Sequence, residues 1–133
     1  MIDQLCELVG RKVVAAHINE TNTVIVLQLK DMFVYLVSTG DCCSNSWFEH
    51  VEGIDALIDK TILSVEEVDY VEVDDSNREC VKSYGFKFKT NHGTFFIEMR
   101  NESNGYYGGD IDLYSSGTLM HDYRSEYWTL KDF

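Results

Sequence analysis

The sequence predicts an α+β domain that is mostly antiparallel β, built from two helix-β-β-β units in a pseudo-twofold arrangement. Three observations predict this class. Apolar and polar residues alternate over stretches of strand length, the turns are rich in Asn, Asp and Gly while proline is absent, and the order of elements repeats in the two halves. With 133 residues, 44% of them hydrophobic, the chain is long enough for one core. We expect either a compact sheet sandwich or a partly closed barrel.

The first unit spans residues 1–50. A short amphipathic helix is expected first, because Ile2, Leu5, Cys6 and Val9 recur at helical spacing and Gly10 follows them. Alternating stretches then predict three strands joined by short turns. These strands are expected over residues 12–18, 23–29 and 32–38, before a polar loop over 39–46.

The second unit spans residues 51–114 and repeats that order with one extra strand. A second helical stripe, from Val51 to Ile58, precedes strands expected over 61–73, 84–90 and 94–100. The nonapeptide 57–65 aligns with 8–16 at a constant offset of 49, which an internal duplication or a pattern common to β-sheet sequences would explain. A further strand is expected around Ile111 and Leu113. The C-terminal extension, residues 115–133, fits a helix or a short strand over 127–130.

The charge of the chain excludes some classes of partner. It carries 23 Asp plus Glu against 11 Lys plus Arg, a net charge of −12, and the basic residues form no stripe. Such a polyanion repels phosphates, so we expect neither direct nucleic-acid binding nor membrane binding. The start of the chain shows no apolar leader and no apolar run reaches membrane-spanning length, so a cytoplasmic location, in a host cell, is expected.

No catalytic or metal-binding signature is visible. The four cysteines have no metal-ligand spacing and the four histidines are isolated in sequence, so no metal and no cofactor are expected. Phosphate-binding glycine loops, nucleophile elbows and zinc-protease motifs are absent. A cysteine nucleophile also needs an electropositive setting, which this acidic chain supplies poorly. We therefore expect a non-enzymatic protein.

Two polar loops, over residues 40–46 and 101–110, hold the candidate ligand-binding residues. The second loop has three glycines that let a partner approach the backbone, and two tyrosines that offer stacking faces. A tight hairpin with a bulge would explain the same residues, and in the first loop Asp41 or Ser46 could simply cap a helix or form a turn. The candidates are Asp41, Cys42, Cys43, Ser44, Asn101, Asn104, Gly105, Tyr106, Tyr107, Gly108, Gly109 and Asp110.

Three strings carry a resemblance to a known family. They are VGRKVV over residues 9–14, GDCCS over 40–44 and NESNGYYGG over 101–109. Over residues 8–114 the chain resembles a family of small bacteriophage and bacterial proteins of unknown function, in which such strings occur in this order. Arg11 stands where that family is expected to have lysine. The resemblance implies a phage or prophage setting but brings no established activity and no catalytic residues.

The leading functional hypothesis is a phage-associated binding protein, serving for example in counter-defence. It would hold a small polar or nucleotide-like ligand, or a segment of host protein, between the two loops. The alternative is an acidic protein that imitates nucleic acid or otherwise blocks a basic host surface. Its contact residues would be Glu66, Glu67, Asp69, Glu72, Asp74, Asp75 and Glu79. A homodimer formed through a sheet edge is a further expectation, since proline guards no edge.

Overall fold

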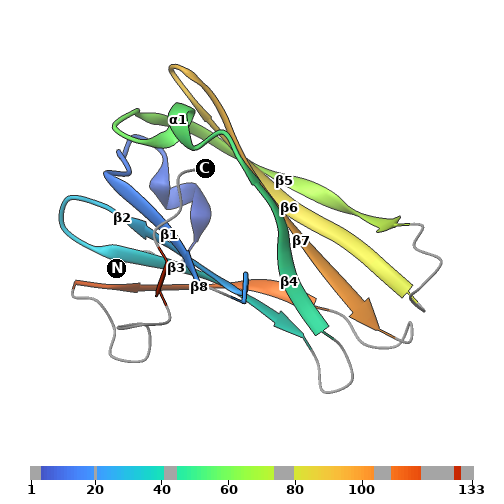
Figure 1. The fold of residues 1–133 in the computed structure, drawn as a ribbon. Coiled ribbons are helices and arrows are strands. Elements are labelled where there is room, and N and C mark those ends of the chain that lie inside the picture. The colour runs from blue at the N-terminus through green and yellow to red at the C-terminus, as the bar shows by residue number, and fades with distance from the viewer. Residues whose placement is uncertain are drawn as a thin grey trace.

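The computed structural model describes residues 4–19, 21–40, 45–73, 80–103, 109–117 and 128–129. Within these residues the chain forms two antiparallel sheets that face one another (Figure 1). One sheet has the order β8-β3-β2-β1-β9 and the other β4-β7-β6-β5. The predicted fold class is confirmed, as a sheet sandwich and not a closed barrel.

The described chain has nine strands and two helical turns. The first sheet contains β1 (Ala15–Asn19), β2 (Val24–Gln28), β3 (Phe33–Gly40), β8 (Gly109–Ser116) and β9 (Trp128–Thr129). The second sheet contains β4 (Asn45–Glu52), β5 (Ile62–Val73), β6 (Cys80–Thr90) and β7 (Gly93–Ser103). The helical turns are the 3₁₀ turn η1 (Leu5–Leu8) and α1 (Ile54–Leu57). No described helix is long and apolar enough to cross a membrane.

The two units exchange their last strands. In each unit three consecutive strands form a meander, β1-β2-β3 in one sheet and β5-β6-β7 in the other. The fourth strand of the first unit, β4, pairs with β7, and the fourth strand of the second unit, β8, pairs with β3. The pseudo-twofold arrangement therefore relates β1 to β5, β2 to β6, β3 to β7 and β4 to β8.

Strand β4 is a correction to the sequence prediction. A polar loop over 39–46 and a helical stripe from Val51 were expected, whereas β3 runs to Gly40 and β4 occupies Asn45–Glu52. The alternation of the strand is interrupted by a register shift between Phe48 and His50. Because a β-bulge inserts one extra residue, it hides the two-residue period from sequence analysis.

Two reciprocal backbone hydrogen bonds join the two units. They involve residues that lie at equivalent positions in the two aligned nonapeptides, 49 residues apart. The Gly10 amide donates to the Ile62 carbonyl oxygen at 2.7 Å, and the Asp59 amide donates to the Val13 carbonyl oxygen at 2.8 Å. Gly10 corresponds to Asp59 and Val13 to Ile62, and both Gly10 and Asp59 have positive φ. The aligned nonapeptides thus occupy equivalent places in the fold.

The helical turns differ in detail from the expected stripes. In η1, Leu8 is fully buried and Leu5 is half-buried, while Cys6 is exposed and Val9 is 47% exposed. The predicted inward positions of Cys6 and Val9 were wrong, because a single 3₁₀ turn has three residues per turn and aligns Leu5 with Leu8. In α1, Ile54 and Leu57 are buried as expected, whereas Val51 belongs to β4.

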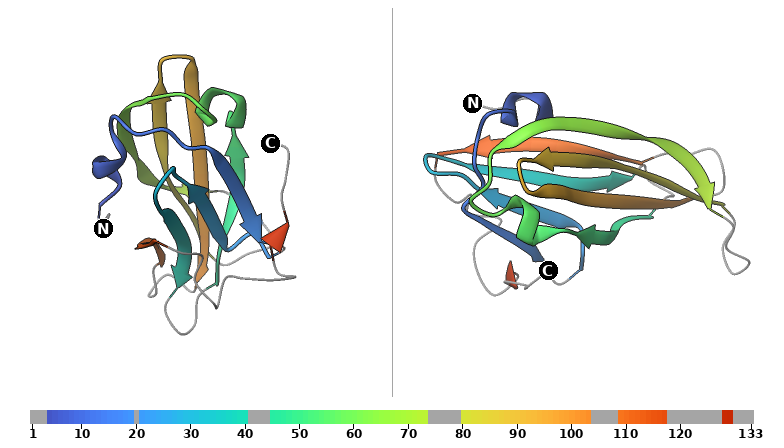
Figure 2. Two further views of the ribbon diagram at one scale, coloured as in Figure 1. Left: turned by 90° about the vertical axis from the view of Figure 1, so that its left-hand side faces the viewer. Right: turned by 90° about the horizontal axis from the view of Figure 1, so that it is seen from above.

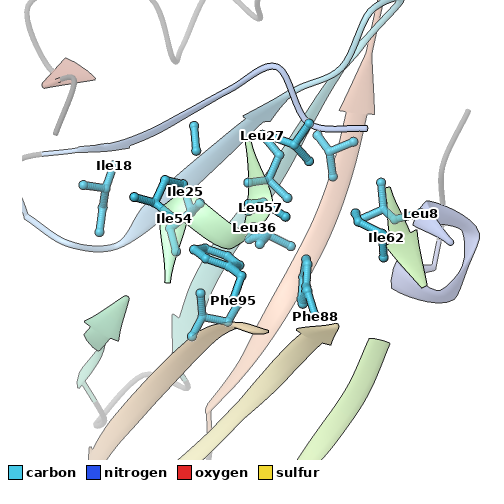
Figure 3. Close-up of a cluster of buried hydrophobic side chains, with 14 of the residues drawn as sticks. Leu8, Ile18, Ile25, Leu27, Leu36, Ile54, Leu57, Ile62, Phe88 and Phe95 are labelled. Atoms are coloured by element: carbon cyan, nitrogen blue, oxygen red, sulfur yellow. The ribbon is translucent and has the colours of Figure 1, made fainter. Parts of the chain in front are cut away.

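The core lies between the sheets and is closed at one end by the helical turns. Figure 3 shows Phe88 and Phe95 of the second sheet pointing toward Leu36 of the first sheet and toward Leu57 of α1. The two phenylalanine rings meet edge to face, with centroids 5.6 Å apart. Two further views in Figure 2 show the sheets as separate layers.

Candidate functional site

Three of the twelve candidate residues lie in described parts of the chain. Asn101 lies in β7, and Gly109 and Asp110 begin β8. The other nine lie outside the described residues, in 41–44 and 104–108. They are Asp41, Cys42, Cys43, Ser44, Asn104, Gly105, Tyr106, Tyr107 and Gly108.

The strand ends on either side of these two loops are neighbours. Gly40, the last residue of β3, pairs with Gly109, the first residue of β8. At the start of β4, Asn45 pairs with Glu102, close to the end of β7. In Figure 1 the ends of β3 and β7 and the start of β4 lie together at the lower right. We call this place, where β3, β4, β7 and β8 meet, the loop corner.

A buried hydrogen-bond chain ties the two sheets together at the loop corner. The Asn101 side chain is 1% exposed, and its Nδ2 donates to Ser46 Oγ at 2.8 Å. Ser46 Oγ donates in turn to the Thr39 carbonyl oxygen at 2.9 Å. The chain thus runs from β7 through β4 to β3. Ser46, considered from sequence as a cap or turn residue, instead lies inside β4 as the acceptor for Asn101.

The carbonyl oxygen of the Asn101 side chain, Oδ1, is buried without a hydrogen-bond partner among the described residues. Leaving a buried acceptor unpaired costs about 1–3 kcal/mol, and most such atoms in native proteins have a partner. An N–H or O–H group of a bound molecule would satisfy this oxygen. Asn101 was predicted as a ligand-binding residue; its Nδ2 is used inside the protein, and its Oδ1 has no partner among the described residues.

A second polar cluster lies on the outer face of the four-stranded sheet. Ser83 Oγ donates to Glu98 Oε2, Arg100 Nε lies 3.4 Å from the same oxygen, and His50 Nε2 lies 3.7 Å from Glu98 Oε1. The carboxylate stands between the hydroxyl and the imidazole. Because a nucleophilic serine needs the imidazole as its own neighbour, this order does not form a catalytic triad.

The part of the chain that is described contains no candidate metal-binding cluster. No group of three or more His, Cys, Asp and Glu side chains converges there. Cys6 is a free, exposed thiol. The pKa of His17, in β1, is lowered from 6.5 because burial disfavours its charged form.

The fold and the loop corner define a small two-sheet β protein with a buried polar seam. The chain belongs to the family described as a domain of unknown function (DUF7448), whose model matches residues 6–113. It is 31% identical over 103 residues to "Uncharacterized protein L278" of Acanthamoeba polyphaga mimivirus, which covers 73% of this chain and 82% of the relative. No solved structure matches the chain. The resemblance to a family of unknown function is confirmed, and the chain has a viral relative.

Proposed function

We propose that this protein is a non-enzymatic binding protein that holds a small polar ligand at the loop corner. The observation that carries the proposal is the Asn101 side chain, whose carbonyl oxygen is buried without a partner among the described residues beside the paired ends of β3 and β8. A ligand that presents an N–H donor, such as a nucleobase, matches this acceptor.

The loops on either side supply the rest of the proposed site. Tyr106 and Tyr107 would stack on a planar ring, and glycine backbone N–H groups at 105, 108 and 109 would hold an anionic group locally. The pairing of Gly40 with Gly109 supports this assignment, because it anchors one end of each loop next to the other. A host protein segment that presents the same donors would use the same acceptor.

The viral setting is part of the proposal. The similarity to a mimivirus protein supports a role in infected cells, and the strings over 40–44 and 101–109 suggest bacteriophage relatives. We propose that the protein acts in the cytoplasm of the host, where a ligand-binding protein could intercept a nucleotide-like defence signal.

Thermal shift against a panel of nucleosides and nucleotides tests the site, with two variants that disturb the same hydrogen bond. Asn101→Leu removes the free acceptor and the donor together, whereas Ser46→Ala removes only the partner of the donor. A true ligand raises the midpoint of the wild type and of Ser46→Ala but not that of Asn101→Leu. A panel without any stabilising compound, or a compound that stabilises all three proteins equally, would contradict the proposal.

A double substitution of Asn104 and Tyr106 tests the loop contribution separately. Both residues lie outside the described parts of the chain, so the expectation rests on sequence. The ligand found in the panel should lose most of its midpoint shift in this variant, while the unliganded midpoint changes little because loop residues carry few core contacts.

The position of β5 favours a second candidate function. This strand forms an edge of the four-stranded sheet, and both Glu66 and Glu67 on it are exposed. Along the same strand and just beyond it the sequence adds Asp69, Glu72, Asp74, Asp75 and Glu79, whose side chains lie outside the described residues. An acidic edge of this kind would block a basic host surface, and such binding weakens steeply as salt rises. Binding at the loop corner should depend little on salt.

A further inference from the structure

A groove of about 340 Å³ opens between the sheets at the side away from β4, where η1 lies over β5, β6 and β8. Its walls are apolar and come from Val65, Phe86, Ile111 and Leu113, all of them half-buried. Cys6 and Glu67 also line the groove, and both are exposed. The volume lies in the range of small-molecule sites, roughly 300–1,000 Å³.

The pseudo-twofold arrangement explains why the groove exists on one side. Phe48 of β4 pairs with Met99 and is 3% exposed, so it fills the space between the sheets. Through the offset of 49 and the strand registers Met99 corresponds to Ser38, which pairs with Ile111 of β8, and Ile111 is only half-buried. An isoleucine thus stands where the sister strand has a phenylalanine, and the smaller side chain leaves a hollow.

The groove has one charge among the described residues that line it, the carboxylate of Glu67. The Glu67 carboxylate forms no ion pair or hydrogen bond with the side chain of another described residue, and its backbone pairs with Phe86 in the β5–β6 ladder. Its neighbour Glu66 lies outside the groove and pairs with Lys89, with Oε1 3.0 Å from Nζ. The protein's net charge of −12 adds to the attraction for cations and the repulsion of anions.

We propose that this groove binds a small cationic amphiphile, with an apolar body between β5, β6 and β8 and an ammonium or guanidinium group against the Glu67 carboxylate. The apolar walls supply most of the affinity, since each buried CH₂ contributes through its removal from water. The carboxylate supplies the selectivity for a cation over an anion. This site is separate from the loop corner.

An NMR titration with octylammonium and, in parallel, octanoate tests the proposal, because the two probes share an apolar chain and differ in charge. Octylammonium should shift the amide signals of Val65, Phe86 and Leu113, and octanoate should bind at least tenfold more weakly. Equal binding of the two probes, or shifts spread over the whole surface, would overturn the assignment.

Two pairs of variants locate the site. Glu67→Gln should weaken octylammonium binding about threefold to fivefold, as for an exposed ion pair, and the matched change Glu66→Gln should leave it unchanged. Ile111→Phe should fill the groove and abolish binding while the fold persists, because Phe48 already occupies the sister position. Equal losses in the two glutamate variants, or full binding by Ile111→Phe, would refute the groove. Asn101→Leu should bind octylammonium normally. This control distinguishes a failure of the groove proposal from a failure of the loop-corner proposal.

Discussion

At the residue scale, two glycines with positive φ offer a matched test of backbone strain. Gly10 has φ +88° with open space around it, whereas a Cβ on Gly53, at φ +87°, would overlap the Thr94 carbonyl oxygen. We expect Gly10→Ala to lower the free energy of unfolding by about 1 kcal/mol through left-handed strain alone. Gly53→Ala should cost at least about twice that. Urea unfolding measures both, and equal losses would show that Gly53 has no close neighbour.

His17 predicts a specific pH dependence. Its pKa is lowered in the folded protein by burial, so below its ordinary value of 6.5 the unfolded chain binds the proton more readily than the folded chain does. The stability contributed by neutral His17 is therefore present near pH 7 and lost as pH falls through 6.5 toward the folded pKa. Unfolding free energies measured from pH 7 to 5 should fall less steeply for His17→Gln than for the wild type. Parallel curves would contradict this.

Single residues also show which parts of the candidate site could be predicted from the sequence and which could not. Asn101 was predicted from its place in an Asn- and Gly-rich stretch, and the structure places it at the loop corner. Its partner Ser46 was not predicted as such, because the two residues are 55 positions apart. Nothing in local periodicity reports a hydrogen bond across strands. Likewise Glu67 was considered only as part of an acidic run, and its place in a groove depends on how β8 and η1 pack.

At the element scale, prediction succeeded where alternation was regular. The strands around Val26, Phe88 and Ile97 were placed correctly to within a few residues. β4 was missed because its bulge breaks the period, and the N-terminal helix was overestimated because four apolar residues fit a helical stripe although only one 3₁₀ turn forms. Short elements obtain their stability from tertiary packing, which a single stretch of sequence does not contain.

Hydrogen exchange tests the reciprocal contacts between the units. The amides of Gly10 and Asp59 donate across the units, to Ile62 and Val13, whereas the Val9 amide donates locally to Cys6. We expect the Gly10 and Asp59 amides to exchange only when the whole domain unfolds, and the Val9 amide to exchange by local fraying. Fast exchange at both Gly10 and Asp59 would show that the units are not joined in this way.

At the scale of the whole molecule, the exchange of β4 and β8 between the sheets was beyond sequence analysis. The repeat at an offset of 49 predicted two similar units but not which strands pair across them, because strand-length patterns carry no information on distant partners. This exchange decides the geometry of both proposed sites. It brings the ends of β3, β4, β7 and β8 to one corner, and it leaves the groove beside β8 on the other side.

The central claim is that the two candidate loops start and end side by side, and cross-strand nuclear Overhauser effects test it most directly. The account predicts contacts between the backbone protons of Gly40 and Gly109, and between those of Ser46 and Asn101. Loss of these contacts, with β3 or β7 paired to a different strand at these residues, would contradict it.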